Sequence, residues 1–175
     1  MIGRKLHKGA GYCHAEIMVP ADDQSGEYLS SSIYNGETVT LTRSKTFANP
    51  GYTVLTFTVD GKELLRMSDY LHESSCMQLG FDSLGMYMAA LPVPIMSGPF
   101  SSPKKTFCSK HVTTALQAAG IEAVEGLNAS IVTPSKLYRV LHEKLRRDRM
   151  VVGSVQYKQR ALAESGVTNA MFTIQ

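Results

Sequence analysis

The 175-residue chain has no long apolar run and no recognisable export signal near its start. It contains no stretch of about eighteen consecutive apolar residues, so we expect no transmembrane segment. Arg4, Lys5 and Lys8 are followed by a glycine-containing segment, whereas a secretory leader continues with an apolar one. We therefore expect the protein to act in the cytoplasm or in another reducing compartment.

Cysteine is also scarce. The chain has only three, Cys13, Cys76 and Cys108, and no two are close in sequence. An odd number without short paired spacings argues against a disulfide framework, and the lack of a CxxC pair argues against a zinc site of that type. We expect free thiols, with no metal and no other cofactor.

Excess charge of one sign is small. The chain carries 18 Lys and Arg against 15 Asp and Glu, a formal net charge of +3. Within residues 136–149 aromatic side chains are almost absent, so we interpret this basic stretch as a solvated helix face and expect no nucleic-acid partner. The alternative is a non-catalytic interaction module that binds anionic partners there. The basic residues are Lys136, Arg139, Lys144, Arg146, Arg147 and Arg149.

The hydrophobic periodicity predicts one α+β domain over residues 1–175, with strands first and helices later. Alternating patterns predict an antiparallel sheet, with Asn35-Gly36 as a hairpin turn. The expected strands are 15–19, 28–34, 37–43 and 52–59.

Helical spacing follows these strands. The expected helices are 62–78, 106–119 and 135–147, and 79–91 fits either a short helix or a buried strand. Four prolines mark 92–103 as a loop. The weak pattern in residues 150–175 predicts a peripheral strand followed by a tail.

The most reactive side chain in this layout is Cys108. It lies in the first turn of the predicted 106–119 helix, where Thr106 is the expected N-cap. A helix N-terminus favours the thiolate, which is the nucleophilic form of cysteine, and its N–H groups are suited to an oxyanion. The alternative is a buried packing cysteine, the commoner role for this residue type.

Two histidines are candidates for the base that such a thiol needs. His14 stands at the start of a short apolar strand, and imidazole exchanges protons readily near neutral pH. The alternative for His14 is a strand-edge histidine bonded to a backbone carbonyl. His111 is on the same predicted helix as Cys108, so we expect it to point away from the open side of the thiol. Its expected role is structural, or that of supporting the site residues without contacting the substrate.

Four short motifs occur in one order along the chain. They are residues 11–17 (GYCHAEI), 81–85 (FDSLG), 107–112 (FCSKHV) and 132–137 (VTPSKL). This ordered set resembles the circularly permuted NlpC-type, papain-like cysteine hydrolases, including the YiiX-like group. The resemblance spans residues 11 to 141.

The resemblance implies a permuted papain-like fold, in which the histidine strand precedes the cysteine helix and the sheet packs against that helix. It implies a thiol hydrolase of the cysteine peptidase or amidase type, with Cys108 as nucleophile and His14 as base. A peptide or other amide is the favoured substrate class. A lipid ester, handled by an acyltransferase or thioesterase of the same fold, comes second, because the acyltransferase branch carries Asn where this chain has Phe107.

In that family a third polar side chain orients the histidine from the next strand. Glu27, at the start of the predicted second strand, is the expected residue. Glu16 competes, because residues two apart on a strand share a face. The same alternation predicts that Cys13 is buried on the opposite face. Weaker alternatives for the third residue are Ser31, Ser32 and Glu37.

Overall fold

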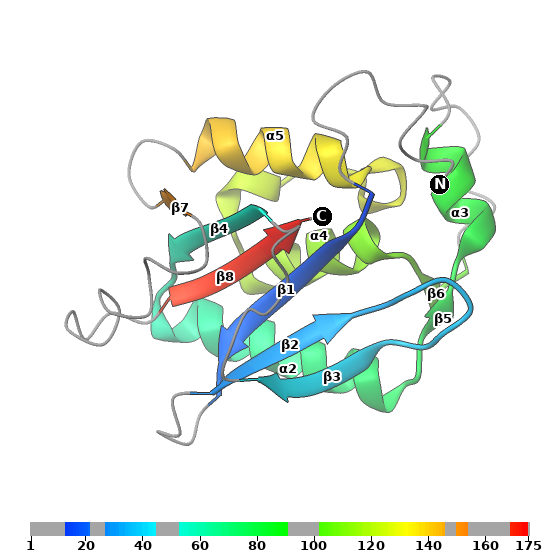
Figure 1. Cartoon of the computed structure of the whole chain (residues 1–175), viewed down its shortest axis with the longest axis horizontal. Coiled ribbons are helices and arrows are strands. Elements are labelled where there is room, and N and C mark those ends of the chain that lie inside the picture. The colour runs from blue at the N-terminus through cyan, green and yellow to red at the C-terminus, as the bar shows by residue number, and fades with distance from the viewer. Residues whose placement is uncertain are drawn as a thin grey trace.

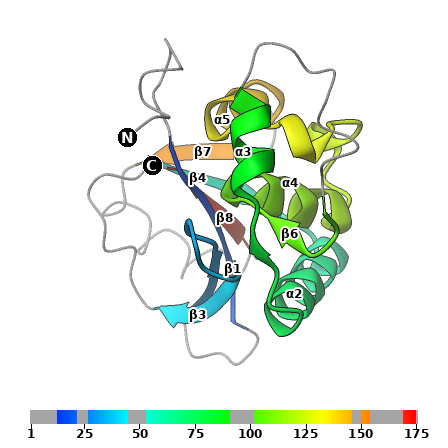
Figure 2. The same cartoon turned by 90° about the vertical axis from the view of Figure 1, so that its right-hand side faces the viewer.

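The computed structural model describes residues 13–21, 27–44, 53–90, 102–145, 150–153 and 169–174. Within these ranges the chain is a mixed α+β structure, as the sequence predicts. A six-stranded antiparallel sheet has the order β3-β2-β1-β8-β4-β7. Helices α2, α4 and α5 lie on one face of this sheet, and α3 lies beyond its end (Figures 1 and 2). None of them is long and apolar enough to cross a bilayer.

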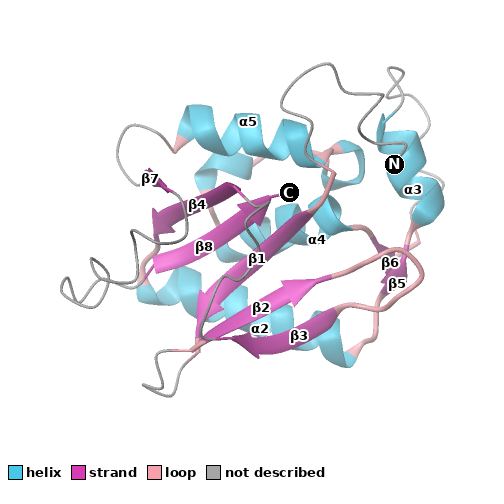
Figure 3. Cartoon of the chain, viewed as in Figure 1, coloured by secondary structure: helices cyan, strands magenta, loops and turns pink. Residues whose placement is uncertain are grey.

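The bounds of the described elements follow (Figure 3). The strands are β1 Ala15–Pro20, β2 Tyr28–Ser32, β3 Thr40–Ser44, β4 Thr53–Thr58, β5 Gly80–Phe81, β6 Lys105–Thr106, β7 Met150–Gly153 and β8 Asn169–Ile174. The α-helices are α2 Gly61–Cys76, α3 Ser83–Ala90, α4 Cys108–Ala119 and α5 Pro134–Lys144. Two short 3-10 turns, η2 Glu122–Val124 and η3 Ala129–Ile131, connect α4 to α5.

Strands β1, β2 and β3 form a meander. Ile17 pairs with Ser31 in the β1–β2 register, and Ser31 pairs in turn with Leu41 of β3. The turn predicted at Asn35-Gly36 lies between β2 and β3, where Gly36 has a φ of +85°. Glycine adopts this left-handed conformation without steric cost. The first part of the sheet therefore follows directly from local sequence signals.

The C-terminal strands are arranged differently from the prediction. Strand β8 lies between β1 and β4 and pairs antiparallel with both, so it is an interior strand rather than a peripheral one. Strand β7 forms the edge, next to β4. A strand's position in a sheet depends on partners distant in sequence, which the local pattern of 169–174 does not reveal. Most of the predicted 92–103 loop and of the predicted tail lies outside the described residues.

The main core lies between the sheet and helices α2 and α4. Val112 and Leu116 of α4 are fully buried, together with Ile17 of β1 and Met67 and Leu71 of α2. Each large aliphatic side chain buried in this way contributes about 1.5–3 kcal/mol. This packing fixes α4 against β1 and α2 and thereby sets the position of its N-terminal turn.

Candidate active site

Cys108 is the first residue of α4. The N-cap is Phe107, in an extended conformation and without a side-chain capping bond, so the prediction of Thr106 as cap is wrong. The Thr106 hydroxyl donates instead to the Phe107 carbonyl, at 3.5 Å. Phe107 therefore offers no side-chain acceptor to the first-turn N–H groups, and the positive end of the helix dipole lies at Cys108.

Cys108 is more buried than an open groove would leave it. Its exposed fraction is 5%, and it belongs to a small apolar cluster with Ile33 and Val39. Phe81 of β5 packs against the same cluster. The thiol is therefore partly a packing group, as the alternative interpretation of the sequence allows, and any reaction there has to occur in a tightly packed environment.

The four motifs meet around this helix start. The Ser109 hydroxyl donates to the Val132 carbonyl at 2.6 Å, and the next residue, Thr133, caps α5 by accepting from the Lys136 amide. On the other side, the Asp82 amide donates to the Thr106 carbonyl at 2.7 Å, directly after the parallel β5–β6 pair. The Cys108 turn is thus held by backbone contacts from segments far apart in sequence.

His14 reaches Cys108 from the start of β1. His14 is 8% exposed, and its imidazole interacts with the side chains of Cys108 and Glu16. Its Nε2 lies 3.2 Å from Glu16 Oε1. Burial alone lowers the pKa of His14, but the hydrogen bonds and charges of Cys108 and Glu16 outweigh it and raise that pKa to about 9. The ring is therefore an imidazolium at neutral pH.

Glu27, the predicted third residue, lies at the other end of the hairpin. Its carbonyl accepts from the Ala21 amide at 2.9 Å, and its carboxylate lies 3.6 Å from Arg43. Ala21 lies seven positions after His14 along extended chain, a span of about 23 Å. The assignment of Glu27 is therefore wrong, and its competitor Glu16 is the acid at His14. The residue at the start of the next strand faces the far end of β1, because antiparallel strands run in opposite directions.

Tyr34 is a residue of the site that the sequence does not single out. Its ring stacks on the His14 imidazole, with ring centroids 4.4 Å apart and an interplanar angle of 19°. Its hydroxyl donates to Glu16 Oε1 at 2.6 Å. Continuing the register that pairs Ile17 with Ser31 puts Tyr34 directly opposite His14. The register of β1 against β2 is the one signal that could have identified Tyr34 as a residue of the site.

The remaining candidates for the third residue have other contacts. The Ser31 hydroxyl lies 2.8 Å from His111 Nε2, and Ser32 lies 3.3 Å from the Thr40 hydroxyl. The Glu37 backbone bonds to Tyr34 and to Phe81. None of these contacts involves His14.

His111 is fully buried on the helix that carries Cys108. Besides its contact with Ser31, its ring lies 5.5 Å from that of Tyr70 in α2. Burial lowers the pKa of His111 to about 4, so the ring is neutral at physiological pH. Its Nδ1 has no hydrogen-bond partner among the described residues.

All three cysteines are free thiols. Cys13 is exposed, so the prediction that it is buried is wrong. Cys13 lies two residues before the start of β1, so the strand alternation on which that prediction rests does not reach it. Cys76, at the end of α2, is exposed as well. In the described ranges, no three His, Cys, Asp or Glu side chains gather as a metal site.

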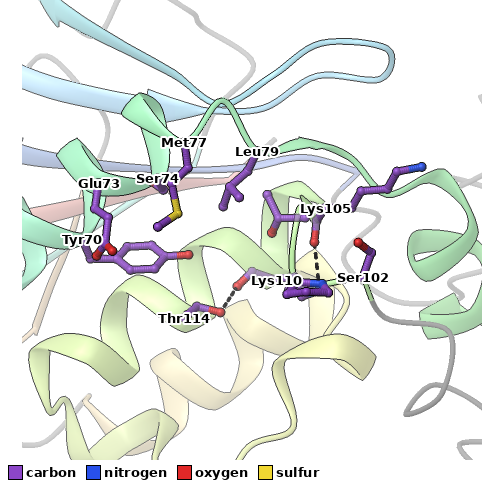
Figure 4. A pocket seen from close by; sticks show the side chains of 11 residues that line it. Tyr70, Glu73, Ser74, Met77, Leu79, Ser102, Lys105, Lys110 and Thr114 are labelled. Atoms are coloured by element: carbon purple, nitrogen blue, oxygen red, sulfur yellow. Dashed lines mark hydrogen bonds between the residues drawn. The ribbon is translucent and has the colours of Figure 1, made fainter.

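A cavity of about 340 Å³ lies on the other side of α4 (Figure 4). Met77 and Leu79 line it from one side, and Lys110 and Thr114 of α4 line it from the other. On a helix, Lys110 and Thr114 lie about 200° and 240° around the axis from Cys108. This cavity therefore faces away from the thiol and is not a groove over it.

The predicted basic helix face is only partly described. Helix α5 buries Leu137 and Leu141, while Arg139 and Lys144 are exposed. Arg146, Arg147 and Arg149 lie outside the described residues.

Comparison of the chain with protein-family models, with curated proteins and with solved structures gives no match.

Proposed function

We propose that the chain is a cysteine hydrolase of the peptidase or amidase type, with Cys108 as nucleophile, His14 as proton carrier and Glu16 as the group that orients His14. The observation that carries this proposal is the interaction of the His14 imidazole with the Cys108 side chain, two residues that lie far apart in the sequence. Local structure does not produce such a contact. Nucleophile, base and orienting acid in one hydrogen-bonded chain are the usual signature of an activated nucleophile.

In this mechanism the Cys108 thiolate attacks the carbonyl carbon of an amide or ester, forming the C–S bond. The developing oxyanion is stabilised by N–H groups of the first turn of α4, which no side chain caps. The His14 imidazolium gives its proton to the leaving nitrogen or oxygen, and the bond to the leaving group breaks. Neutral His14 then takes a proton from water, which attacks the thioester and releases the acid and the thiolate.

Cys108 and Glu16 together account for the protonation state of His14 that this mechanism needs. Glu16 Oε1 engages Nε2, so the mechanism assigns the proton exchange with the sulfur to Nδ1. Burial disfavours the charged ring, and the contacts with Cys108 and Glu16 reverse that effect, raising the pKa of His14 to about 9. A charged imidazole beside the thiol is the acid that the leaving group requires.

The architecture supports a permuted papain-like fold as part of the same proposal. The histidine strand β1 comes before the cysteine helix α4, and the sheet packs against that helix. An amide of a peptide is the preferred substrate class, with a lipid ester second, because Phe107 precedes the nucleophile. Such an enzyme requires a reduced Cys108 and therefore a reducing compartment.

Competitive alkylation tests the proposal. In the unmodified protein, limiting iodoacetamide at neutral pH is expected to label Cys108 before Cys13 and Cys76, as read by peptide mass spectrometry. Access alone predicts the opposite order, because Cys108 is the buried thiol and the other two are exposed. His14→Ala should slow labelling of Cys108, whereas His72→Ala, on the exposed side of α2, serves as the matched control. Labelling of Cys13 and Cys76 first would overturn the proposal.

A pair of glutamate variants separates the two assignments of the orienting acid. Glu16→Gln should slow the alkylation of Cys108 and lower the pKa of His14, because it removes the charge next to Nε2. Glu27→Gln is the matched control and should change neither, since Glu27 lies beside Arg43 at the far end of the hairpin. Equal effects of the two variants would exclude the assignment of Glu16.

A further inference from the structure

Glu16 and His14 are both in contact with one aromatic side chain from the neighbouring strand. Tyr34 donates its hydroxyl to Glu16 Oε1 at 2.6 Å and stacks its ring on His14 at 4.4 Å. The same Glu16 oxygen lies 3.2 Å from His14 Nε2. Tyr34, Glu16 and His14 therefore form a closed arrangement in which each side chain contacts the other two.

This arrangement restricts the rotation of the Glu16 and His14 side chains, which would otherwise move the proton donor out of position. A glutamate side chain has several rotamers, and the phenol removes most of them by fixing Oε1. The stack limits rotation of the imidazole, and the face of an aromatic ring attracts the cationic form of its neighbour. A hydrogen bond to a carboxylate is also stronger than one between neutral groups.

We infer that Tyr34 is a positioning residue of the proposed hydrolase, which holds the Glu16 carboxylate through its hydroxyl and the His14 imidazolium through its ring. The inference rests on the proposed function. Tyr34 does not act on the substrate in this role; it acts through His14. Its side chain is 42% exposed, which is high for a large aromatic residue, so core packing does not account for its placement.

The test is a pH titration of His14 in the full chain, monitored by the NMR signals of its imidazole ring. Tyr34→Leu removes ring and hydroxyl and is expected to lower the pKa of His14 by about one unit, a tenfold change in the ratio of charged to neutral ring. Tyr34→Phe keeps the ring and removes only the hydroxyl, so the pKa of His14 is expected to lie between those of the wild type and Tyr34→Leu. Tyr87→Leu is the matched control, because Tyr87 is 47% exposed on α3 and is expected to leave His14 unchanged.

Each result decides a part of the inference. A His14 titration in Tyr34→Leu equal to that of the wild type would overturn it. A Phe variant equal to wild type would remove the role of the hydroxyl, and one equal to the Leu variant would remove that of the ring.

A second readout uses the thiol. Iodoacetate is anionic and iodoacetamide is neutral, so the ratio of their rates at Cys108 reports a cation beside the sulfur. At a pH of about 8.5, Tyr34→Leu should reduce this ratio by up to about threefold, following the smaller charged fraction of His14. If Cys108 lacks enhanced reactivity in the wild type while Tyr34→Leu still shifts the His14 titration, the proposed function fails and the positioning of His14 by Tyr34 stands. If Cys108 is hyper-reactive in the wild type while Tyr34→Leu leaves the His14 titration unchanged, the proposed hydrolase stands and the positioning role of Tyr34 fails.

Discussion

The raised pKa of His14 makes the stability of the fold depend on pH in a defined window. Burial favours the neutral ring, but contacts with Cys108 and Glu16 raise the pKa from 6.5 to about 9. One unit corresponds to about 1.4 kcal/mol, so the folded state favours the imidazolium by roughly 3 kcal/mol relative to the unfolded chain. Because the pKa is higher in the folded state, this contribution is complete below pH 6.5 and disappears as the pH rises through about 9.

The measurement is the free energy of unfolding in urea, at several pH values between about 6 and 10, under reducing conditions. The wild type is compared with His14→Gln, both carrying Cys13→Ser and Cys76→Ser so that the exposed thiols do not titrate. The difference between the two proteins should be constant at low pH. It should then fall by about 3 kcal/mol between roughly pH 6.5 and 9 and level off.

The sign of this difference is the decisive result. A difference that stays constant over the whole range would mean that His14 titrates alike in the folded and unfolded chains. A difference that grows with pH would mean that the neutral imidazole is the form the fold prefers. Either outcome would refute the imidazolium beside Cys108 and, with it, the proton donor in the proposed mechanism.

Two further substitutions test the packing around the site. Cys108→Ala should lower the free energy of unfolding in urea by about 1 kcal/mol, because the thiol is buried in an apolar cluster; unchanged stability would show that it does not pack there. Gly85→Ala should destabilise the fold by about 1–3 kcal/mol in thermal unfolding, because the new Cβ would lie 2.4 Å from Asp82 Oδ2. Gly80→Ala is its control, with nothing within 4 Å of the new Cβ, and similar losses in both would contradict this explanation.

Residues close together in sequence determine much of the fold. The Asn35-Gly36 turn, the apolar face of α4 and the glycine that ends it are local signals, and all three appear in the structure, with Gly120 in the left-handed conformation. Asp60 is a further example. It lies two residues after β4 and caps α2 through reciprocal bonds with Glu63, so two residues close in sequence fix where this helix begins.

The candidate site follows only in part from sequence. Cys108 and His14 were identified by their residue types and by their places at the start of a helix and of a strand. The third member was assigned wrongly, because Glu27 and Glu16 differ only in where the strand register puts them. Tyr34 was overlooked for the same reason, since its contact with His14 crosses from one strand to the next.

The sequence by itself determined the α+β class, the order of the first four strands and of the helices after them, and the pair of side chains that carry the proposed chemistry. Each of these depends on local periodicity, turn chemistry or residue type. Only the tertiary structure decided that β8 lies inside the sheet, that Cys108 is buried and that Glu16 and Tyr34 hold His14. Those features depend on pairing and packing between distant segments. A one-residue change of register would reverse which side chains share a face, and no local pattern records that choice.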